Sequence, residues 1–235
     1  MVGTWINVGA VLLGSLVGLL VGRRIPNGIT RSVTVGVGLV TLVVGTKLAI
    51  GTENPLVLLL ALLLGGGLGT WLRLEERLGH LGEASERLFP AGMRGTIPQG
   101  FVAATLLFCV GPMAILGAIR DGVYGDWQIL GLKSIMDGIS SIGLVAGLGP
   151  GVFLSAASVL LYQGGISLVA RWAVAPGVGT ALAPSPALTE FNAVGGTVLL
   201  ALSLKLLGVR DLKVGNLLPA LGLAPLLGWA LARLG

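Results

Sequence analysis

Residues 101–122 read FVAATLLFCVGPMAILGAIRDG, an apolar run that Gly111 and Pro112 interrupt near its middle. The run is long enough to cross a bilayer, which takes about 20 apolar residues. Pro112 removes a backbone donor, however, and a helix in hydrocarbon has to satisfy its own backbone groups. A break at this point needs neighbouring helices or a polar cavity to tolerate it. The run therefore predicts a broken span inside a bundle of membrane helices, not a plain anchor.

The composition around this run excludes a soluble domain. The 235 residues are 54% hydrophobic and only 11% charged, whereas soluble domains carry about 25% charged residues. The 40 glycines fall inside apolar runs, as expected where membrane helices pack through small residues. The net charge of +5 comes from basic residues near the ends of these runs, where membrane topology accounts for them. The lipid bilayer is therefore the predicted environment, and nucleic acid is not a predicted partner.

Enzymatic chemistry is not indicated either. The chain has one cysteine, Cys109, and one histidine, His80, which excludes an internal disulfide and any metal site built from several Cys or His residues. No Ser/His/Asp arrangement and no phosphate-binding glycine loop appears in the sequence. We expect no catalytic residues, no metal site and no cofactor.

Apolar stretches of spanning length occur eight times along the chain. They lie at about 4–22, 31–50, 55–72, 99–119, 129–147, 150–171, 188–208 and 213–234. The stretch at 129–147 is short, rich in glycine and polar, so whether it crosses fully stays open. The two stretches on either side of Gly149-Pro150-Gly151 also fit one long broken helix, which would give seven spans. The prediction is an all-α, polytopic membrane protein with seven or eight transmembrane helices, forming one membrane domain over residues 1–235.

Basic residues in the short connections predict the orientation. They concentrate in the first and third connections, at Arg23, Arg24 and Arg31 and then at Arg73, Arg77, Arg87 and Arg94. The odd-numbered connections are therefore predicted to be cytoplasmic, and eight spans would place both termini outside. Within the third connection, residues 73–89 alternate leucines with paired charges such as Glu83 and Arg87, which predicts an amphipathic helix along the interface. A binding surface for a partner is the alternative interpretation.

An internal repeat is the most informative long-range pattern. An offset of 158 residues aligns Lys47 with Lys205, Gly38 with Gly196 and Trp71 with Trp229. The second and third spans thus resemble the seventh and eighth, and a displacement by five spans reverses their orientation in the membrane. We predict an inverted three-helix repeat, although shared helix composition would also give such matches. Its parts are repeat unit one at 4–72, the amphipathic helix at 73–89, central polar spans at 99–147 and repeat unit two at 150–234.

Asp137 is the sharpest candidate for function. A carboxylate in the middle of an apolar span costs about 2.5–3.5 kcal/mol on insertion scales, so it should face the protein interior or water and be paired. Lys133 lies four residues earlier on the same helical face. The pair predicts an ion-coupled or proton-coupled site. In the alternative interpretation, the span begins late and both residues lie at the interface.

Further polar groups accompany this pair. Ser134, Ser140 and Ser141 lie on the same predicted span, and Gln163 is an amide in the next one. Serines in membrane helices often bind their own backbone or serve as small packing residues, so they support a site only together with Asp137.

Two other positions carry candidate contacts. The break at Gly111-Pro112 frees backbone carbonyls that can coordinate a cation or a substrate, unless a neighbouring helix fills the kink. Glu190 and Asn192 open the seventh span. A carboxylate in the first turn of this span suggests a role in binding, but it also complements the dipole of an ordinary helix.

A stripe of small residues marks the first span. Asn7 is followed at near-helical spacing by Gly14, Gly18 and Gly22, a pattern typical of close helix packing. Glycine stripes of this kind also make a homodimer plausible.

Five motifs together support a family resemblance: LLFCVGPMAILGAIRDG, KSIMDGISS, LSAASVLLYQG, EFNAVGG and GNLLPAL. On these motifs the chain resembles the bacterial YdfK-like membrane proteins, catalogued as a domain of unknown function. The resemblance implies a multi-pass protein of the bacterial inner membrane and a family often described as transporters, and it assigns no catalytic residue. The positions that belong to the family pattern are Gly111, Pro112, Asp121, Asp137, Gly138, Gln163, Glu190, Gly196, Asn216 and Pro219.

The leading functional hypothesis is a secondary transporter of a small solute or ion. Asp137 would be the coupling carboxylate, and the Gly111-Pro112 break would contact the substrate. A passive channel formed between protomers of an oligomer is the first alternative. A scaffold that transports nothing and binds a partner through residues 73–89 is the second.

Overall fold

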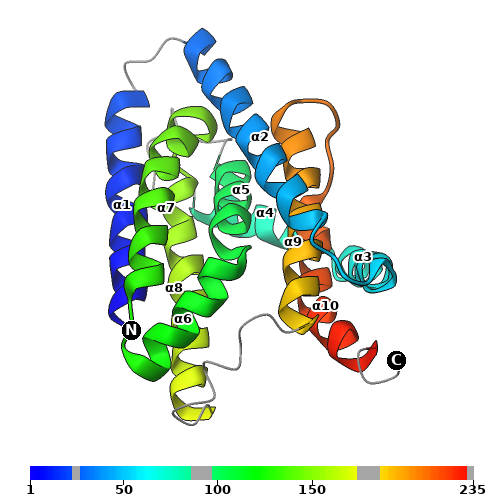
Figure 1. Ribbon diagram of the computed structural model, residues 1–235. Helices are drawn as coiled ribbons and strands as arrows, with labels where there is room; N and C mark the ends of the chain where they lie inside the picture. The colour runs from blue at the N-terminus through cyan, green and yellow to red at the C-terminus, as the bar shows by residue number, and fades with distance from the viewer. Residues whose placement is uncertain (23–26, 86–96, 174–185, 232–235) are drawn as a thin grey trace. The chain divides into compact units, whose positions relative to one another are not determined.

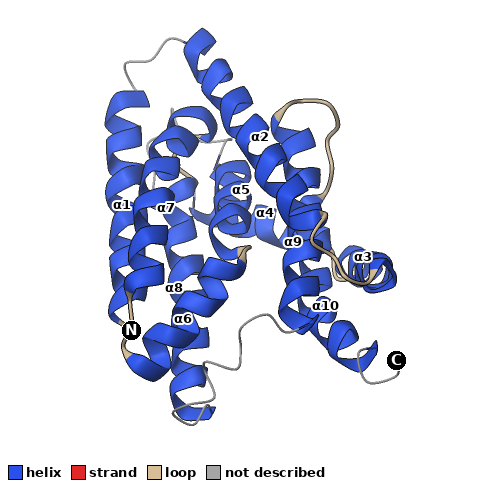
Figure 2. Ribbon diagram, in the orientation of Figure 1, coloured by secondary structure: helices blue, strands red, loops and turns tan. Residues whose placement is uncertain are grey.

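The computed structural model describes residues 1–22, 27–85, 97–173 and 186–231. All regular secondary structure in these residues is helical, as Figure 2 shows, which confirms the all-α prediction. In chain order the helices are α1 (Val2–Gly22), α2 (Asn27–Ala49), α3 (Pro55–Trp71), α4 (Leu74–Ser85), α5 (Ile97–Cys109), α6 (Pro112–Tyr124), α7 (Gln128–Leu148), α8 (Val152–Ala173), α9 (Pro186–Leu206), the 3-10 turn η4 (Val214–Leu217) and α10 (Leu218–Leu231) (Figure 1).

The described helices agree with the predicted spans in position. Six are long and apolar enough to cross a membrane, and the number rises to eight if two bent pairs each form one span. The bent pairs are α3 with α4, at 52°, and α5 with α6, at 63°. Helix α7 is unbroken over 21 residues, so the stretch at 129–147 has the length to cross. Helices α7 and α8 are each long and apolar enough to cross a membrane alone, which disfavours the alternative of one long broken helix.

The relative direction of α1 and α7 restricts the count further. Gly3 lies against Leu130, Gly14 against Gly138 and Gly18 against Ile142, so the two helices run parallel. Two parallel spans must be separated by an odd number of crossings. Helix α2 supplies one, so the two bent pairs must either both cross or both return. Among the described helices, this direction gives six or eight candidate spans if α2 crosses the membrane.

Two compact units divide the chain. The first, unit 1, comprises residues 1–34 and 82–183. In it the predicted glycine stripe of α1 packs against α7, because a side chain at Gly14 would overlap the carbonyl oxygen of Gly138 and one at Gly18 would meet Val145. This confirms the expected close packing. Two helix backbones in such close contact place polar side chains on neighbouring turns within hydrogen-bonding distance of each other.

The second, unit 2, comprises residues 35–81 and 184–235. Helix α2 packs antiparallel to α9, with Gly45 against Gly196 and Gly38 against Leu207. Helix α3 packs antiparallel to α10. In this pair Gly65 adjoins Ala220, and Gly69 adjoins Asn216. A small core of Ala61, Val194, Ala220 and Ala224 fills the space between these helices.

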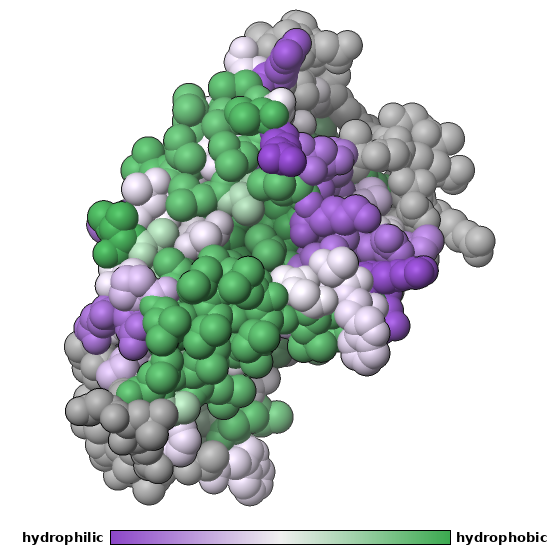
Figure 3. Space-filling model, turned by 90° about the vertical axis from the view of Figure 1, so that its right-hand side faces the viewer, coloured by the Kyte–Doolittle hydropathy of each residue, from purple (hydrophilic) through white to green (hydrophobic). Residues whose placement is uncertain are grey.

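The outer faces of the helices are apolar, as a bilayer requires. On α3, for example, Leu59 and Leu63 are exposed, and so is Trp71 near its end. Figure 3 shows hydrophobic residues over much of the visible surface, with the hydrophilic residues gathered in separate patches. Exposed leucines in such number would be unfavourable in water but suit contact with lipid tails.

The predicted amphipathic segment forms helix α4, which begins one residue after Arg73, whose φ of 52° is left-handed. The helix is described up to Ser85, so residues 86–89 of that prediction lie outside the described residues. Its position along the membrane interface stays a prediction.

Candidate functional site

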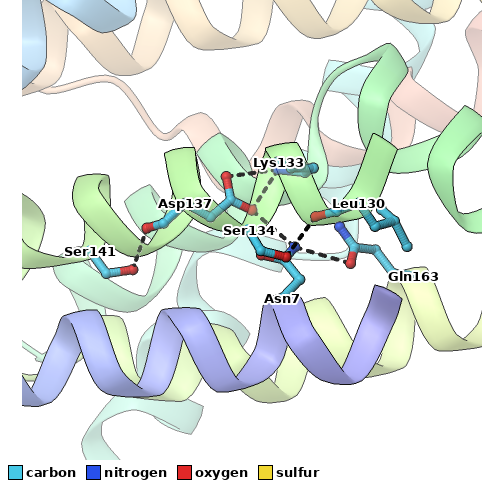
Figure 4. Close-up of polar contacts among 7 residues, drawn as sticks. All are labelled: Asn7, Leu130, Lys133, Ser134, Asp137, Ser141 and Gln163. Carbon is cyan, nitrogen blue, oxygen red and sulfur yellow. Dashed lines mark hydrogen bonds and ion pairs between the residues drawn. The ribbon is translucent and has the colours of Figure 1, made fainter. Parts of the chain in front are cut away.

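Helix α7 carries an ion pair inside unit 1. The Nζ atom of Lys133 lies 2.8 Å from Oδ1 and 2.6 Å from Oδ2 of Asp137 (Figure 4). Each of the two residues is only 6% exposed. Because α7 begins at Gln128, Asp137 lies about 14 Å along the helix at 1.5 Å per residue, close to its midpoint. This position disfavours the alternative in which the span begins late and the pair lies at the interface.

Two amides connect this ion pair to neighbouring helices. The Nδ2 atom of Asn7 on α1 donates to Asp137 Oδ2 at 3.0 Å and to Gln163 Oε1 on α8 at 3.1 Å. Asn7 and Gln163 are both fully buried. Figure 4 shows the side chains converging from α1, α7 and α8. We call Asn7, Lys133, Asp137 and Gln163 the α7 cluster.

The α7 cluster is costly to build. Taking two charges out of water carries a penalty of several kcal/mol per ion, which their attraction offsets only when hydrogen bonds and geometry are good. Apolar residues of similar volume often stabilise a fold as well or better. A charged pair in the middle of a span is therefore better explained by a functional role than by a contribution to the stability of the fold.

Asn7 is the member of the cluster that sequence reasoning misses. Its place ahead of Gly14 and Gly18 favours a packing role, which the two glycines do fulfil. The amide itself bonds to residues 130 and 156 positions away, contacts that no local pattern reveals. The one local signal is an isolated amide in a largely apolar span.

The three serines contribute less. Ser134 Oγ donates to the carbonyl of Leu130 at 2.6 Å, and Ser141 Oγ donates to the carbonyl of Asp137 at 2.7 Å. Both hydroxyls thus bind their own helix. Ser140 is only half-buried, and no hydrogen bond to a described residue joins it to the α7 cluster.

The predicted break is present where α5 ends at Cys109 and α6 begins at Pro112. Gly111 bridges the two helices with φ of 127°, a conformation that favours glycine because it has no Cβ. Helix α6, which follows the break, packs against α7, because a Cβ at Gly117 would overlap the side chain of Leu130. The break between α5 and α6 and the α7 cluster therefore lie in the same unit of the structure.

Glu190 lies in unit 2 and serves a different set of groups. Its Oε1 accepts from the backbone N–H groups of Glu53 and Asn54, both at 2.9 Å, and its Oε2 accepts from the Thr52 hydroxyl at 2.7 Å. The carboxylate is 1% exposed. It holds the connection that leads into α3. Asn192 is half-buried, and its Oδ1 has no hydrogen-bond partner among the described residues.

Replacing Glu190 by Ala should lower the free energy of unfolding by about 2–4 kcal/mol, because three donors lose their acceptor. Glu190→Gln keeps one acceptor oxygen and should lose about half as much. The measurement is the thermal unfolding of purified protein in detergent. Asp211→Ala is the control, since that carboxylate is 89% exposed. Equal stability of the Glu190→Ala and Asp211→Ala variants would contradict this role for Glu190.

A second polar cluster in unit 2 also escapes sequence reasoning. Glu75 Oε1 lies 2.8 Å from Lys205 Nζ, and Glu75 Oε2 accepts from the N–H of Gly215 at 2.5 Å. The N–H of Glu75 in turn donates to Asn216 Oδ1 at 2.9 Å. These contacts tie the start of α4 to the end of α9 and to η4. They involve partners at least 130 residues apart, so spacing along the chain gives no hint of them.

Comparison with known proteins places the chain among relatives of undetermined function. The sequence family described as "Protein of unknown function (DUF554)" matches residues 2–229. The uncharacterized protein YqgA of Escherichia coli is 34% identical over 95% of this chain and 94% of its own. The uncharacterized membrane protein YdfK of Bacillus subtilis is 28% identical over 100% of this chain and 99% of its own. No solved structure matches the chain significantly.

Proposed function

The chain belongs to the DUF554 family of membrane proteins, and we propose that it is a secondary transporter of a small solute or ion in the bacterial inner membrane. Movement of the solute is coupled to a proton or another cation. Asp137 is the coupling carboxylate, and the break at Gly111-Pro112 contributes to the substrate site.

The single observation that carries this proposal is the ion pair of Lys133 and Asp137 at the middle of a full-length span, buried and bridged to two other helices. Ionisable residues at such depth typically mark ion pathways and proton relays. A carboxylate that exchanges a lysine partner for a proton or cation changes its hydrogen bonds to α1 and α8. Ion binding is thereby linked to helix packing, which is what coupling requires.

The arrangement of unit 2 supports the inverted repeat that we propose for this transporter. The 158-residue offset relates α2 to α9 and α3 to α10. These are the same two pairs that pack antiparallel through Gly45 and Gly196 and through Gly65 and Ala220. Elements related by a twofold axis in the membrane plane run in opposite directions and meet near that axis. Many secondary transporters are built in this way.

The channel and scaffold alternatives differ from this proposal in what they predict. A passive channel would conduct its ion without moving protons against a gradient. A scaffold would move nothing. The homodimer stays a prediction, and Gly14 and Gly18 do not support it, because α7 already occupies that face of α1.

The test of the proposal uses purified protein in liposomes that contain a pH-sensitive dye. A panel of inorganic ions, small organic acids and amines is added outside, and wild type is compared with Asp137→Asn. We expect at least one solute to drive proton movement in wild type and none to do so in Asp137→Asn. Conductive flux without proton movement would favour the channel. If no solute in the panel drives proton movement in wild type, proton coupling to those solutes loses its support.

A further inference from the structure

The buried face of α1 carries polar atoms that lack partners. Thr4 Oγ1 and Asn7 Oδ1 are fully buried on α1, and neither makes a hydrogen bond within the described part of the chain. The same holds for Gln163 Nε2 on α8. A buried polar group without a partner is expensive, and native proteins usually satisfy it with ordered water. Three such groups in one place therefore require an explanation.

These three groups adjoin one another and the α7 cluster. Asn7 and Gln163 are joined by their own hydrogen bond of 3.1 Å. Thr4 lies one turn before Asn7 on α1, and a Cβ on Gly164 would lie 3.8 Å from Thr4 Cγ2, which places Thr4 beside the residue that follows Gln163. Thr4, Asn7 and Gln163 together form a row of polar groups. The row leads from the beginning of α1 to the carboxylate of Asp137.

The hydrogen-bonding groups that are free in this row indicate which kind of molecule it binds. The side-chain amide of Asn7 cannot be flipped by 180°, because its acceptor Oδ1 would then face the acceptor oxygens of Asp137 and Gln163. The free atoms are therefore an acceptor on Asn7, a donor on Gln163 and a hydroxyl on Thr4, which is both. A metal cation would be repelled by the Gln163 N–H, and an anion by the Asn7 oxygen. Water offers both functions and makes about three hydrogen bonds when it is buried.

We propose that a file of water molecules held by Thr4, Asn7 and Gln163 connects Asp137 to the end of unit 1 at which α1 begins, and that the proton is the coupling ion of the proposed transporter. The inference rests on that proposed function and specifies its ion and the side from which it enters. Protons pass along hydrogen-bonded water to the carboxylate, whereas a metal ion would have to displace the Lys133 ammonium.

Charged groups surround both ends of the file. At its entrance Asp121 Oδ2 accepts from the N–H of Thr4 at 3.2 Å, and Asp121 Oδ1 lies 3.1 Å from the ammonium of Met1. At its inner end Asp137 is paired with Lys133. Asp121 is therefore the carboxylate that lies beside Thr4 at the entrance of the file.

The file is closed beyond Asn7. The next residue on the same face is Val11, which is fully buried and apolar. One turn later Gly14 lies in backbone contact with Gly138, on the side of α1 that packs against α7. Val11 is thus the gate that separates the file from the far side, and Ser15, whose buried Oγ also has no partner among the described residues, lies behind it.

A gain of proton leak tests the inference. Val11→Ser places a hydroxyl at the gate, and Val11→Thr does so with an almost unchanged shape in case serine destabilises α1. In liposomes with a pH gradient and no solute, we expect either variant to leak protons at least tenfold faster than wild type. The same substitution at Leu12, which is 41% exposed on the outer face of α1, is the control and should leave the rate unchanged.

A second substitution shows whether the leak follows the file. Adding Asp137→Asn or Gln163→Leu to the leaking variant should return the rate to that of wild type, because each removes a group that conducts or holds water. A leak that survives both additions overturns the inference, and so does the absence of a leak in folded Val11→Ser and Val11→Thr. Either result leaves the proposed function standing if Asp137 remains necessary for solute-driven proton movement in the parent protein.

Discussion

Replacing Asp137 by Ala should cost about 3–5 kcal/mol of unfolding free energy, because it leaves the Lys133 ammonium buried and unpaired. Both groups are 6% exposed, so water cannot take over the lost contacts without opening the packing of α1 on α7. The measurement is the unfolding of purified protein in mixed micelles by denaturant. An exposed ion pair supplies the control. Lys213 and Glu76 lie 3.7 Å apart with side chains 67% and 51% exposed, and truncating that pair should change stability by less than about 1 kcal/mol.

The double variant Lys133→Met with Asp137→Leu separates stability from function. It removes both charges and keeps the volume, so its stability should equal that of wild type or exceed it by about 1–4 kcal/mol. Transport should nevertheless be lost, because the coupling carboxylate is gone. A double variant that is both stable and active would show that the pair is merely a structural element of α7.

The second large effect is expected at Gly14. A methyl group at this position would overlap the backbone carbonyl of Gly138, and a backbone atom cannot move aside as a side chain can. Helices α1 and α7 would have to separate, which should cost at least about 2 kcal/mol and displace Asn7 from Asp137. The measurement is the same unfolding experiment on Gly14→Ala, together with solute-driven proton movement in liposomes.

Gly9 provides the matched control for this substitution. It lies in the same helix, and a Cβ there would meet no atom within 4 Å. Gly9→Ala should therefore be neutral or stabilise α1 by up to about 1 kcal/mol, as alanine does in a helix interior. Equal tolerance of alanine at Gly9 and Gly14 would contradict the close packing of α1 and α7 on which the α7 cluster depends.

The parts of the structure that the sequence predicts are those with local causes. Hydropathy over about 20 residues locates each span, and Gly111 with Pro112 marks the break between α5 and α6. The pairing of Lys133 with Asp137 follows from the helical period, since residues four apart share one face. Each of these signals lies within one or two turns of the chain.

The parts that sequence reasoning misses depend on contacts between distant residues. Asn7 interacts with Asp137 and Gln163 only because the glycines of α1 bring α7 close. Glu75 interacts with Lys205 only because α4 turns sharply away from α3 at Arg73. An isolated Asn or Glu gives no periodic signal, so its partner cannot be read from spacing. The parallel direction of α1 and α7 is also a property of packing alone.

The measurement that tests the central claim most directly is solute-driven proton movement in liposomes, comparing wild type with the Lys133→Met/Asp137→Leu double variant. Equal amounts of folded protein are reconstituted, and the thermal unfolding midpoint of each sample is recorded first. The account predicts proton movement in wild type and none in a double variant of equal or greater stability. Proton movement of equal size in both proteins would contradict it.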